Sequence, residues 1–360
     1  MDAKDFHFDA FCRYMEEKQN FLRKFLSGEY QGPVLTQRGY GNVFGVESVT
    51  KERALAAWLD VLDSNMQLHC DVGYTYLEPW CGVPVYANAF GSPLFWTDTA
   101  DVQSKPRYMF ADEVANLPLP QAGQCQMMQM VLEYIRYFKE QTHGLIPLSL
   151  TDTQSPNDTA SLILDPCELF AVSLEEPEAL EDFMTKVTQL IGDFTEMQID
   201  AIGPELYTAP GHMMLSDPSM KGIALSDDNM AVLSPASYAV IGKPYNEILS
   251  RRFGGVSLHS CGVISHNIPL LLETEGLQQL DFKITDFEPN DASLLAEKFA
   301  GTGIILKPCI YPNESLDRLL PLLRSDIKLV LHVFTDGTID ERNRQYDTMA
   351  QFVHDHHRTV

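Results

Sequence analysis

Basic residues are scarce in this sequence. Its 360 residues include 26 Lys and Arg against 50 Asp and Glu, so the formal net charge is −24 at pH 7. A chain with this excess of negative charge is repelled by nucleic acid and by anionic membrane surfaces. We therefore expect neither as a partner, and a polycarboxylate substrate would need a local basic pocket.

Paired cysteines and long apolar runs are also missing. The seven cysteines are scattered and odd in number, and no two of them form a C-x-x-C pair. This usage fits a reducing compartment better than a disulfide framework. The first residues, Met1–Asp5, do not form a basic segment ahead of an apolar core, and no run approaches 18 apolar residues. We expect a cytoplasmic protein that is neither secreted nor membrane-spanning.

Eight short apolar runs alternate along the chain with amphipathic stretches such as Lys51–Asn65 and Glu178–Ile202. The runs are Pro33–Gln37, Leu68–Tyr76, Gly144–Thr151, Lys221–Asp227, Gly255–Cys261, Leu280–Phe287, Gly303–Cys309 and Lys328–Thr335. Strand–helix alternation at this spacing predicts the α/β class and a single (β/α)₈ TIM barrel. We expect residues 33–360 to form the barrel and residues 1–32 an N-terminal helical extension. Two segments rich in Pro, Gly and Asp, Phe90–Gln121 and Gly203–Met220, are expected as loops over a barrel face.

An imidazole and a thiol stand two residues apart at the end of the fifth run, within Gly254–Gly262. Residues i and i+2 of a strand lie on the same face, so His259 and Cys261 can point at one centre. A nitrogen and a sulfur ligand together suit Zn²⁺. The alternative for such an isolated pair is a buried structural cysteine beside a hydrogen-bonded histidine.

Polar residues follow several of the other runs. They are Tyr76, Trp80, Asp152, Gln154, Asp227, Asp228, Asn229, Glu288, Cys309 and His332. In a barrel the active site lies at the carboxyl ends of the strands, so these side chains are expected around one pocket. We predict acid–base roles for Asp152, Asp227, Asp228 and Glu288, and substrate contacts for Tyr76, Trp80, Gln154 and Asn229. Each also has an ordinary explanation, such as a turn cap for an aspartate or core packing for Cys309.

Several stretches resemble the uroporphyrinogen decarboxylase (URO-D) superfamily, in the same order along the chain. The resemblance is carried by Leu77–Gly82, Thr151–Pro156, Ser226–Met230 and His259–Gly262, which read LEPWCG, TDTQSP, SDDNM and HSCG. It runs from about residue 33 to residue 335. Within the superfamily, the chain is similar to a little-characterised branch related to the corrinoid-dependent methylcobalamin:coenzyme M methyltransferases. The resemblance implies a TIM barrel.

The resemblance also implies a chemistry. In the methyltransferase branch, zinc activates a small thiol, which accepts a methyl group from a methylcorrinoid carried by a separate protein. His259 and Cys261 match the zinc-binding H-x-C pair of that branch. The family's third ligand is a cysteine on the eighth strand, where this chain has His332. Either His332 or Cys309 is expected to complete the set. The implied substrate is a small thiol or methylated compound.

One departure limits the choice of activity. Decarboxylases of the superfamily carry an arginine-rich segment on the first strand, whereas Thr36–Gly41 here contains a single arginine, Arg38. Substrates with many carboxylates need several cationic donors. Uroporphyrinogen decarboxylation is therefore disfavoured. Two alternatives stay open: a metal-independent decarboxylase that works through Asp227 or Asp228, and a non-catalytic barrel that binds a small molecule.

Overall fold

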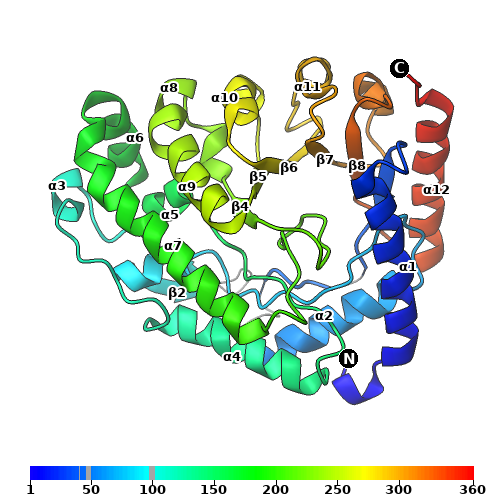
Figure 1. Ribbon diagram of the computed structural model, residues 1–360, viewed down its shortest axis with the longest axis horizontal. Coiled ribbons are helices and arrows are strands. Elements are labelled where there is room, and N and C mark those ends of the chain that lie inside the picture. The colour runs from blue at the N-terminus through cyan, green and yellow to red at the C-terminus, as the bar shows by residue number, and fades with distance from the viewer. Residues whose placement is uncertain (40, 46–49, 97–101) are drawn as a thin grey trace.

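The computed structural model describes residues 1–39, 41–45, 50–96 and 102–360. Tyr40, in the first-strand stretch, and residues 97–101, in the first predicted loop, lie outside the described part. Within it, six parallel strands form one sheet in the order β1-β8-β7-β6-β5-β4 (Figure 1). Their bounds are β1 Val34–Thr36, β4 Ile223–Ser226, β5 Val256–His259, β6 Leu277–Lys283, β7 Ile305–Ile310 and β8 Lys328–Val333. A separate antiparallel pair consists of β2 (Leu94–Trp96) and β3 (Val102–Ser104).

Two extended segments complete the ring of strands. Leu77 pairs in parallel with Leu148, and Gln154 pairs in parallel with Ser226 at the end of β4. On the other side, the Asp71 N–H donates to the Leu35 carbonyl in β1. The predicted TIM barrel is thus confirmed, but the second and third runs are extended segments with single bridges instead of regular strands.

The third segment has no regular ladder because its neighbour changes along its length. Its N-terminal part, at Leu148, pairs with both Leu77 and Tyr207. Tyr207 belongs to the connection that leads into β4. Its C-terminal part, at Gln154, pairs with Ser226 of β4. A ladder needs consecutive residues that face one partner strand. The inserted connection around Tyr207 removes that continuity.

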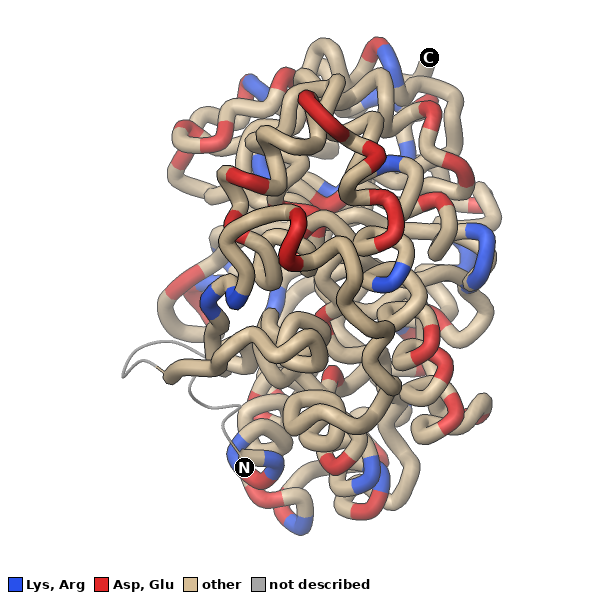
Figure 2. The backbone as a smooth tube through the Cα atoms, turned by 90° about the vertical axis from the view of Figure 1, so that its left-hand side faces the viewer, with Lys and Arg blue, Asp and Glu red and all other residues tan. Residues whose placement is uncertain are grey.

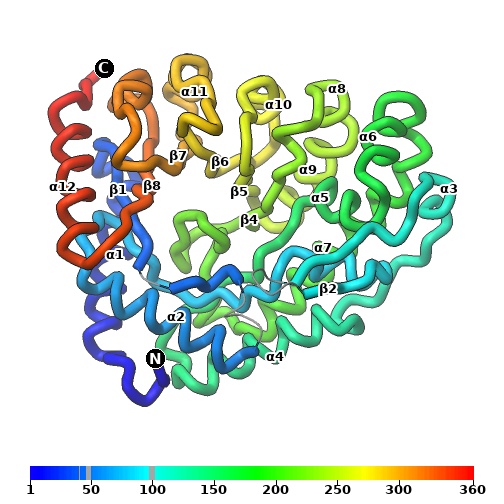
Figure 3. The backbone as a smooth tube through the Cα atoms, turned by 180° about the vertical axis from the view of Figure 1, so that it is seen from behind, coloured from blue at the N-terminus to red at the C-terminus, as the bar shows by residue number. Residues whose placement is uncertain are grey.

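Helices cover the outside of the ring (Figure 3). They are α1 Phe8–Ser27, α2 Lys51–Asn65, α3 Ala111–Val114, α4 Gln126–Gln141, α5 Pro156–Ser161, α6 Pro166–Glu175, α7 Glu181–Ile202, α8 Pro235–Ser237, α9 Lys243–Phe253, α10 Ile268–Glu273, α11 Ala292–Phe299 and α12 Ile339–His356. Short 3₁₀ turns include η5 Asp228–Ala231, and a π-turn at Tyr238–Gly242 joins α8 to α9. Helix α2 has the predicted bounds. Helix α1 buries Phe11, Leu22 and Phe25, and the last two pack against Val34 of β1 and Val330 of β8. The division at residue 32 stays a prediction.

The lumen of the barrel is polar. Side chains of alternate strand residues face inward, and they include Thr36, Ser226, Ser257, His259, Gln279, Asp281, Lys307 and His332, all buried. The other strand face carries Leu and Ile side chains, such as Leu258, Leu280 and Leu306, within the main hydrophobic core. Because β-strands alternate with period two, one strand supplies both surfaces. The polar lumen is where the chemistry of this barrel can occur.

The composition of Gly203–Met220 predicts a loop over a barrel face. The structure differs, because this segment enters the lumen. The Leu215 N–H and carbonyl bond the two ends of the Gln279 side chain in β6, and the Ala224 N–H donates to the Pro210 carbonyl. Residues Met213–Ser216 line a lumen cavity of about 20 Å³ together with Lys307 and His332. The barrel interior is therefore filled partly by a loop.

Acidic residues occur along the whole chain, with the fewer basic ones between them (Figure 2). In the described residues no helix combines the length and the apolar character that crossing a bilayer requires. All seven cysteines are free thiols. These observations agree with the composition of the sequence.

Candidate active site and metal-binding group

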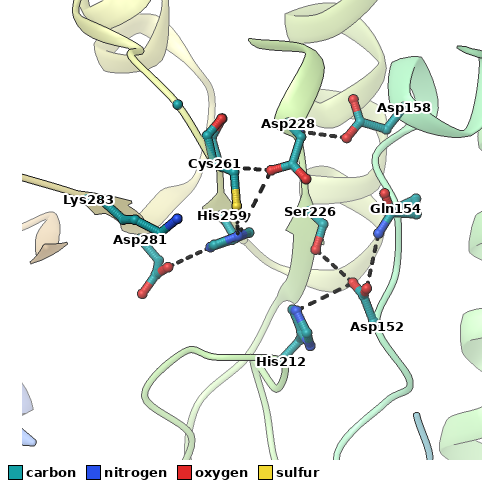
Figure 4. A network of polar contacts seen from close by, with 12 residues as sticks. Asp152, Gln154, Asp158, His212, Ser226, Asp228, His259, Cys261, Asp281 and Lys283 are labelled. Carbon is teal, nitrogen blue, oxygen red and sulfur yellow. Dashed lines mark hydrogen bonds and ion pairs between the residues drawn. The ribbon is translucent and has the colours of Figure 1, made fainter. Parts of the chain in front are cut away.

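His259, Cys261 and Asp228 meet at the carboxyl ends of β4 and β5 (Figure 4). The Cys261 Sγ lies 3.4 Å from His259 Nε2, and the nearer Asp228 oxygen lies 3.9 Å from the same nitrogen. One ligand atom from each residue lies within 4.8 Å of the other two. Cys261 and Asp228 are exposed and His259 is buried. This donor set of nitrogen, sulfur and oxygen fits Zn²⁺ and leaves room for a fourth ligand.

A buried ion pair holds the His259 ring from behind. The Asp281 carboxylate in β6 accepts from His259 Nδ1 at 2.5 Å and, through its other oxygen, from Lys307 Nζ at 2.6 Å. Burial opposes the charged forms, but Lys307 and His259 together lower the pKa of Asp281, and Asp281 raises the pKa of Lys307. A carboxylate on the far nitrogen is the usual second partner of a metal-binding histidine. The ring therefore presents Nε2 to Cys261 and Asp228.

The same contacts act on the charge of His259. Burial disfavours the imidazolium, but the hydrogen bonds with Asp281 and Cys261 outweigh it and raise the pKa of His259 well above its usual value. A metal binds the neutral imidazole, so a metal bound at this candidate site would have to displace this proton. Its affinity would therefore increase as the pH rises.

The loop that carries Cys261 is fixed on two sides. The Asp228 carboxylate accepts from the Cys261 N–H at 2.7 Å, and Glu288 accepts from the Gly262 N–H at 3.1 Å. Glu288 also accepts from Lys283 Nζ at 2.9 Å. The predicted acid Glu288 thus lies next to the candidate metal ligands His259, Cys261 and Asp228, here called the metal-binding group, and its hydrogen bond holds the loop that carries Cys261.

Asp158 orders the turn that carries Asp228. Its two carboxylate oxygens accept from the N–H groups of Asp228 and Asn229, at 2.6 and 2.9 Å. Burial, with the nearby carboxylates of Asp227 and Asp228, raises the pKa of Asp158 well above its usual value. The turn η5 is thereby held at the end of β4.

A second polar group lies beside the first. His212, from the lumen loop, bonds Glu78 through Nδ1 at 2.9 Å, and its Nε2 lies 3.7 Å from Asp152. Asp152 accepts from Ser226 Oγ at 2.7 Å and from Gln154 Nε2 at 3.0 Å. Burial raises the pKa of Glu78. Burial opposes charge on His212 as well, but Asp152 and Glu78 outweigh it and raise the His212 pKa.

Asp227 lies apart from both groups. Its carboxylate is fully buried and accepts from the amides of Asn157 and Asn246, at 2.6 and 2.7 Å, and from the Tyr238 hydroxyl at 3.0 Å. Burial raises its pKa. These donors come from α5, the π-turn and α9. The Asp227 carboxylate joins the helices to β4, and its three hydrogen bonds do not reach the side chains of His259, Cys261 or Asp228. The Asp227 backbone N–H, by contrast, donates to the His259 carbonyl at 2.7 Å.

The two residues expected as third metal ligand lie elsewhere among the described residues. Cys309 is buried on β7, with its Sγ 3.9 Å from an Asp281 oxygen. Burial and the Asp281 charge raise the Cys309 pKa. His332 lines the lumen cavity beside Lys307, and its buried Nδ1 has no hydrogen-bond partner. Asp228, predicted as an acid, is instead the third residue of the donor set with His259 and Cys261.

The residues predicted to contact substrate are placed differently from one another. Tyr76 lines the lumen cavity, and Gln154 bonds Asp152. Trp80 is buried with its ring 5.6 Å from Phe44, and the Arg38 guanidinium lies over the same Phe44 ring at 5.1 Å. Asn229 donates to Ser161 and to the Asn157 carbonyl, so it binds α5. Substrate contact by these four stays a prediction.

Sequence reasoning missed several residues of the site. Asp281 and Lys307 lie inside β6 and β7, whereas the barrel rule predicts functional residues at strand ends. Their signal was a charged residue within an apolar run, at Leu280-Asp281-Phe282 and Leu306-Lys307-Pro308. His212 had no such signal, because its segment has no periodic pattern.

Comparison with known proteins supports the fold. The family model of uroporphyrinogen decarboxylase matches residues 66–207. No curated protein matches the chain in sequence. Of the solved structures, 23 chains match, among them a methyltransferase from Methanosarcina mazei with a TM-score of 0.65 and 14% sequence identity. That match covers 93% of this chain and 99% of the methyltransferase. At this identity the likeness concerns the fold.

The family match includes Glu78, Trp80, Asp152 and Asp158 but ends before His212 and the H-x-C pair. The two polar groups of the site thus differ in how they are related to known proteins. The chain resembles the uroporphyrinogen decarboxylase superfamily in sequence over residues 66–207, and its fold is the TIM barrel of that superfamily, shared over most of its length with a methyltransferase.

Proposed function

We propose that this barrel is a zinc-dependent methyltransferase that transfers a methyl group from a methylcorrinoid, carried by a separate protein, to a small thiol. The observation that carries the proposal is the donor set of Asp228, His259 and Cys261, within 4.8 Å of one another, with Asp281 on the far side of the imidazole. We further propose a cytoplasmic location, in keeping with seven free thiols.

The chain's own residues would hold and orient the reacting groups. Zinc, when bound, lowers the pKa of a thiol that coordinates it and so supplies a thiolate near neutral pH. Asp281 fixes the His259 ring, and Lys307 balances the Asp281 charge in the lumen. Asp228 and Glu288 hold the backbone on either side of Cys261. Cys261 and Asp228 are exposed, so a methyl donor on another protein can approach this end of the barrel.

Zinc content measured per chain tests the proposal. Wild-type protein purified without chelator and supplied with Zn²⁺ should hold about one equivalent. Cys261→Ser should lose it, and Asp228→Asn should bind at least about tenfold more weakly, because even partners outside the ligand set change metal affinity by 10–100-fold. Cys309→Ser is the matched control, since its thiol lies outside the donor set, and it should retain the metal.

Two other outcomes would contradict the proposed ligand set or the role of the metal. If Cys309→Ser loses zinc and Asp228→Asn keeps it, the third ligand is Cys309, as the sequence alone allowed. If the wild type holds no stoichiometric zinc, thiol activation by metal is wrong for this protein. For wild-type protein that does hold zinc, activity is assayed as loss of methylcobalamin in the presence of a small thiol, and we expect turnover that depends on zinc.

A second candidate function has one specific observation in its favour. Asp281, His259 and Cys261 form a carboxylate–imidazole–thiol series with contacts of 2.5 and 3.4 Å. This order also suits a metal-free cysteine nucleophile. Alkylation of Cys261 by iodoacetamide separates the two functions. Protection by stoichiometric Zn²⁺ favours the metal site, whereas fast alkylation unchanged by Zn²⁺ favours the nucleophile.

A further inference from the structure

The group of Glu78, His212 and Asp152 has no part in holding a metal, yet it lies directly beside the residues that do. The rings of His212 and His259 are nearly perpendicular, with centroids 6.2 Å apart. Figure 4 places His212 and Asp152 below the His259–Cys261–Asp228 group, with Ser226 between them. A small molecule held at Cys261 therefore has this second group as its neighbour.

The group contains unused hydrogen-bonding capacity. Each Asp152 oxygen accepts one bond, from Ser226 or from Gln154, and a carboxylate oxygen can accept two. The 3.7 Å between Asp152 and His212 Nε2 is too long for a hydrogen bond. At such a separation an atom of a third molecule can bond both groups.

The second observation is an unpartnered atom. Glu78 is fully buried, and its Oε2 has no hydrogen-bond partner, while its Oε1 bonds His212. The His212 ring thus has the Glu78 carboxylate at Nδ1 and the Asp152 carboxylate near Nε2. Arg38 is the nearby cation, and its guanidinium lies over the Phe44 ring without an ion pair to either carboxylate in the described residues. Buried acceptors without donors are costly, so the group favours a ligand that donates hydrogen bonds and opposes an anion.

We propose that Asp152 and His212, with Glu78 behind them, form a substrate subsite that binds an amino or hydroxyl group of the small thiol. The inference rests on the proposed function for the thiol, and it names the substrate class: thiols that carry a hydrogen-bond donor a few atoms from sulfur. A thiol with a carboxylate or sulfonate in the same place is disfavoured, because two carboxylates repel it.

Calorimetric binding of four short thiols to the zinc-loaded protein, without methyl donor, tests this inference. The thiols are 2-aminoethanethiol, 2-mercaptoethanol, ethanethiol and 3-mercaptopropionate. We expect the first two to bind about tenfold or more tightly than ethanethiol, since a hydrogen bond to a charged group contributes at least that much. 3-Mercaptopropionate should bind more weakly than ethanethiol.

Variants identify the group responsible. Asp152→Asn keeps the size of the side chain, and it should reduce the affinity for 2-aminoethanethiol to that for ethanethiol. If the Asp152→Asn variant binds ethanethiol as tightly as the wild type does, its fold and metal site are intact. His212→Gln should weaken the same preference. Asp112→Asn, on the exposed surface of α3, is the matched control and should keep the wild-type preference.

Equal affinity of the wild type for all four thiols, or a preference for 3-mercaptopropionate, would overturn the inference and leave the proposed function standing. The converse case is also distinguishable. If the protein holds no zinc, the proposed function fails, and the same titrations are made on metal-free protein with ethanolamine and propionate. Binding of ethanolamine that Asp152→Asn removes would support the subsite, and its absence would overturn it.

Discussion

Two adjacent acids, Asp227 and Asp228, have opposite surroundings at the end of β4. Asp228 is exposed and lies near His259 and Cys261, while Asp227 is buried among donors from the surrounding helices. Neighbouring residues in an extended chain point to opposite sides. One β-strand end thus supplies a group for the site and a group for the fold.

Removal of the buried acid is expected to affect stability more than chemistry. Asp227→Ala leaves two amides and a hydroxyl without their acceptor, at about 1–3 kcal/mol for each unsatisfied group. We predict a loss of at least about 3 kcal/mol in the free energy of unfolding, measured in urea. Asp228→Ala should lose no more than about 1 kcal/mol, because water can replace its exposed carboxylate. Equal losses in the two variants would contradict this assignment.

His212 gives the stability of the zinc-free protein a dependence on pH. Its pKa is raised in the fold by Asp152 and Glu78 against the effect of burial. The resulting stabilisation is complete below the unfolded pKa of about 6.5 and is lost as pH rises through the folded pKa. We therefore predict that Tm falls between pH 6 and pH 9.

The variant His212→Gln should flatten part of that slope, since the titrating group is gone. Calorimetric Tm values at half-unit pH steps measure the effect, in the presence of chelator so that His259 is without metal. The same slope in variant and wild type would mean that His212 keeps its ordinary pKa in the fold.

The candidate site was predictable where residue type and strand position coincide. The H-x-C pair at the end of β5 is an example, because strand alternation alone brings His259 toward Cys261. The third residue of the donor set, Asp228, was not predictable as a metal ligand. Cys309 and His332 have suitable chemistry, but their positions around the ring direct them at Asp281 and at the lumen cavity, and a one-dimensional pattern contains no such angles.

At the scale of elements, helix α12 begins with a reciprocal cap. The Thr338 hydroxyl accepts from the Glu341 N–H, and the Glu341 carboxylate accepts from the Thr338 N–H. The sequence Thr338-Ile339-Asp340-Glu341 has the matching S/T-x-x-E pattern. This helix buries Tyr346, Met349 and Val353, and the Tyr346 hydroxyl donates to the Leu35 carbonyl in β1.

The cap should contribute measurably to stability. We predict that Thr338→Ala lowers the free energy of unfolding by about 1 kcal/mol. Thr348→Ala, in the exposed middle of the same helix, is the control and should leave it unchanged or raise it slightly, since Ala is the better helix former. A loss at both positions would instead point to a general sensitivity of α12.

Six of the eight predicted strands form ladders, and the other two do not. Runs such as Lys328–Thr335 were recognisable because buried parallel strands are continuously apolar. The third run looks similar in composition, but the Tyr207 segment pairs with Leu148 and interrupts its ladder. That insertion comes from about 60 residues further along the chain, so local sequence could not reveal it.

At the scale of the whole molecule, the charge of −24 opposes the folded state. Like charges are closer together in the compact chain than in the unfolded one, and salt screens their repulsion. We predict that Tm at pH 7.5 rises when NaCl is increased from 10 to 150 mM. Near pH 5, where the net charge is smaller, the same addition should have less effect. A Tm that falls with salt at pH 7.5 would indicate that specific ion pairs outweigh the repulsion.

The irregular side of the barrel has a consequence for how such a protein can diverge. Glu78, Asp152 and His212 all stand on segments outside the regular ladders, whereas His259 and Asp281 stand on neighbouring strands that are bonded residue by residue. An insertion or deletion near Tyr207 would disturb few backbone hydrogen bonds between strands. One in β5 would change the register of that strand with both of its neighbours and so move its side chains. Descendants of this chain can therefore acquire new small-molecule preferences through length changes on one side while inheriting the other side intact.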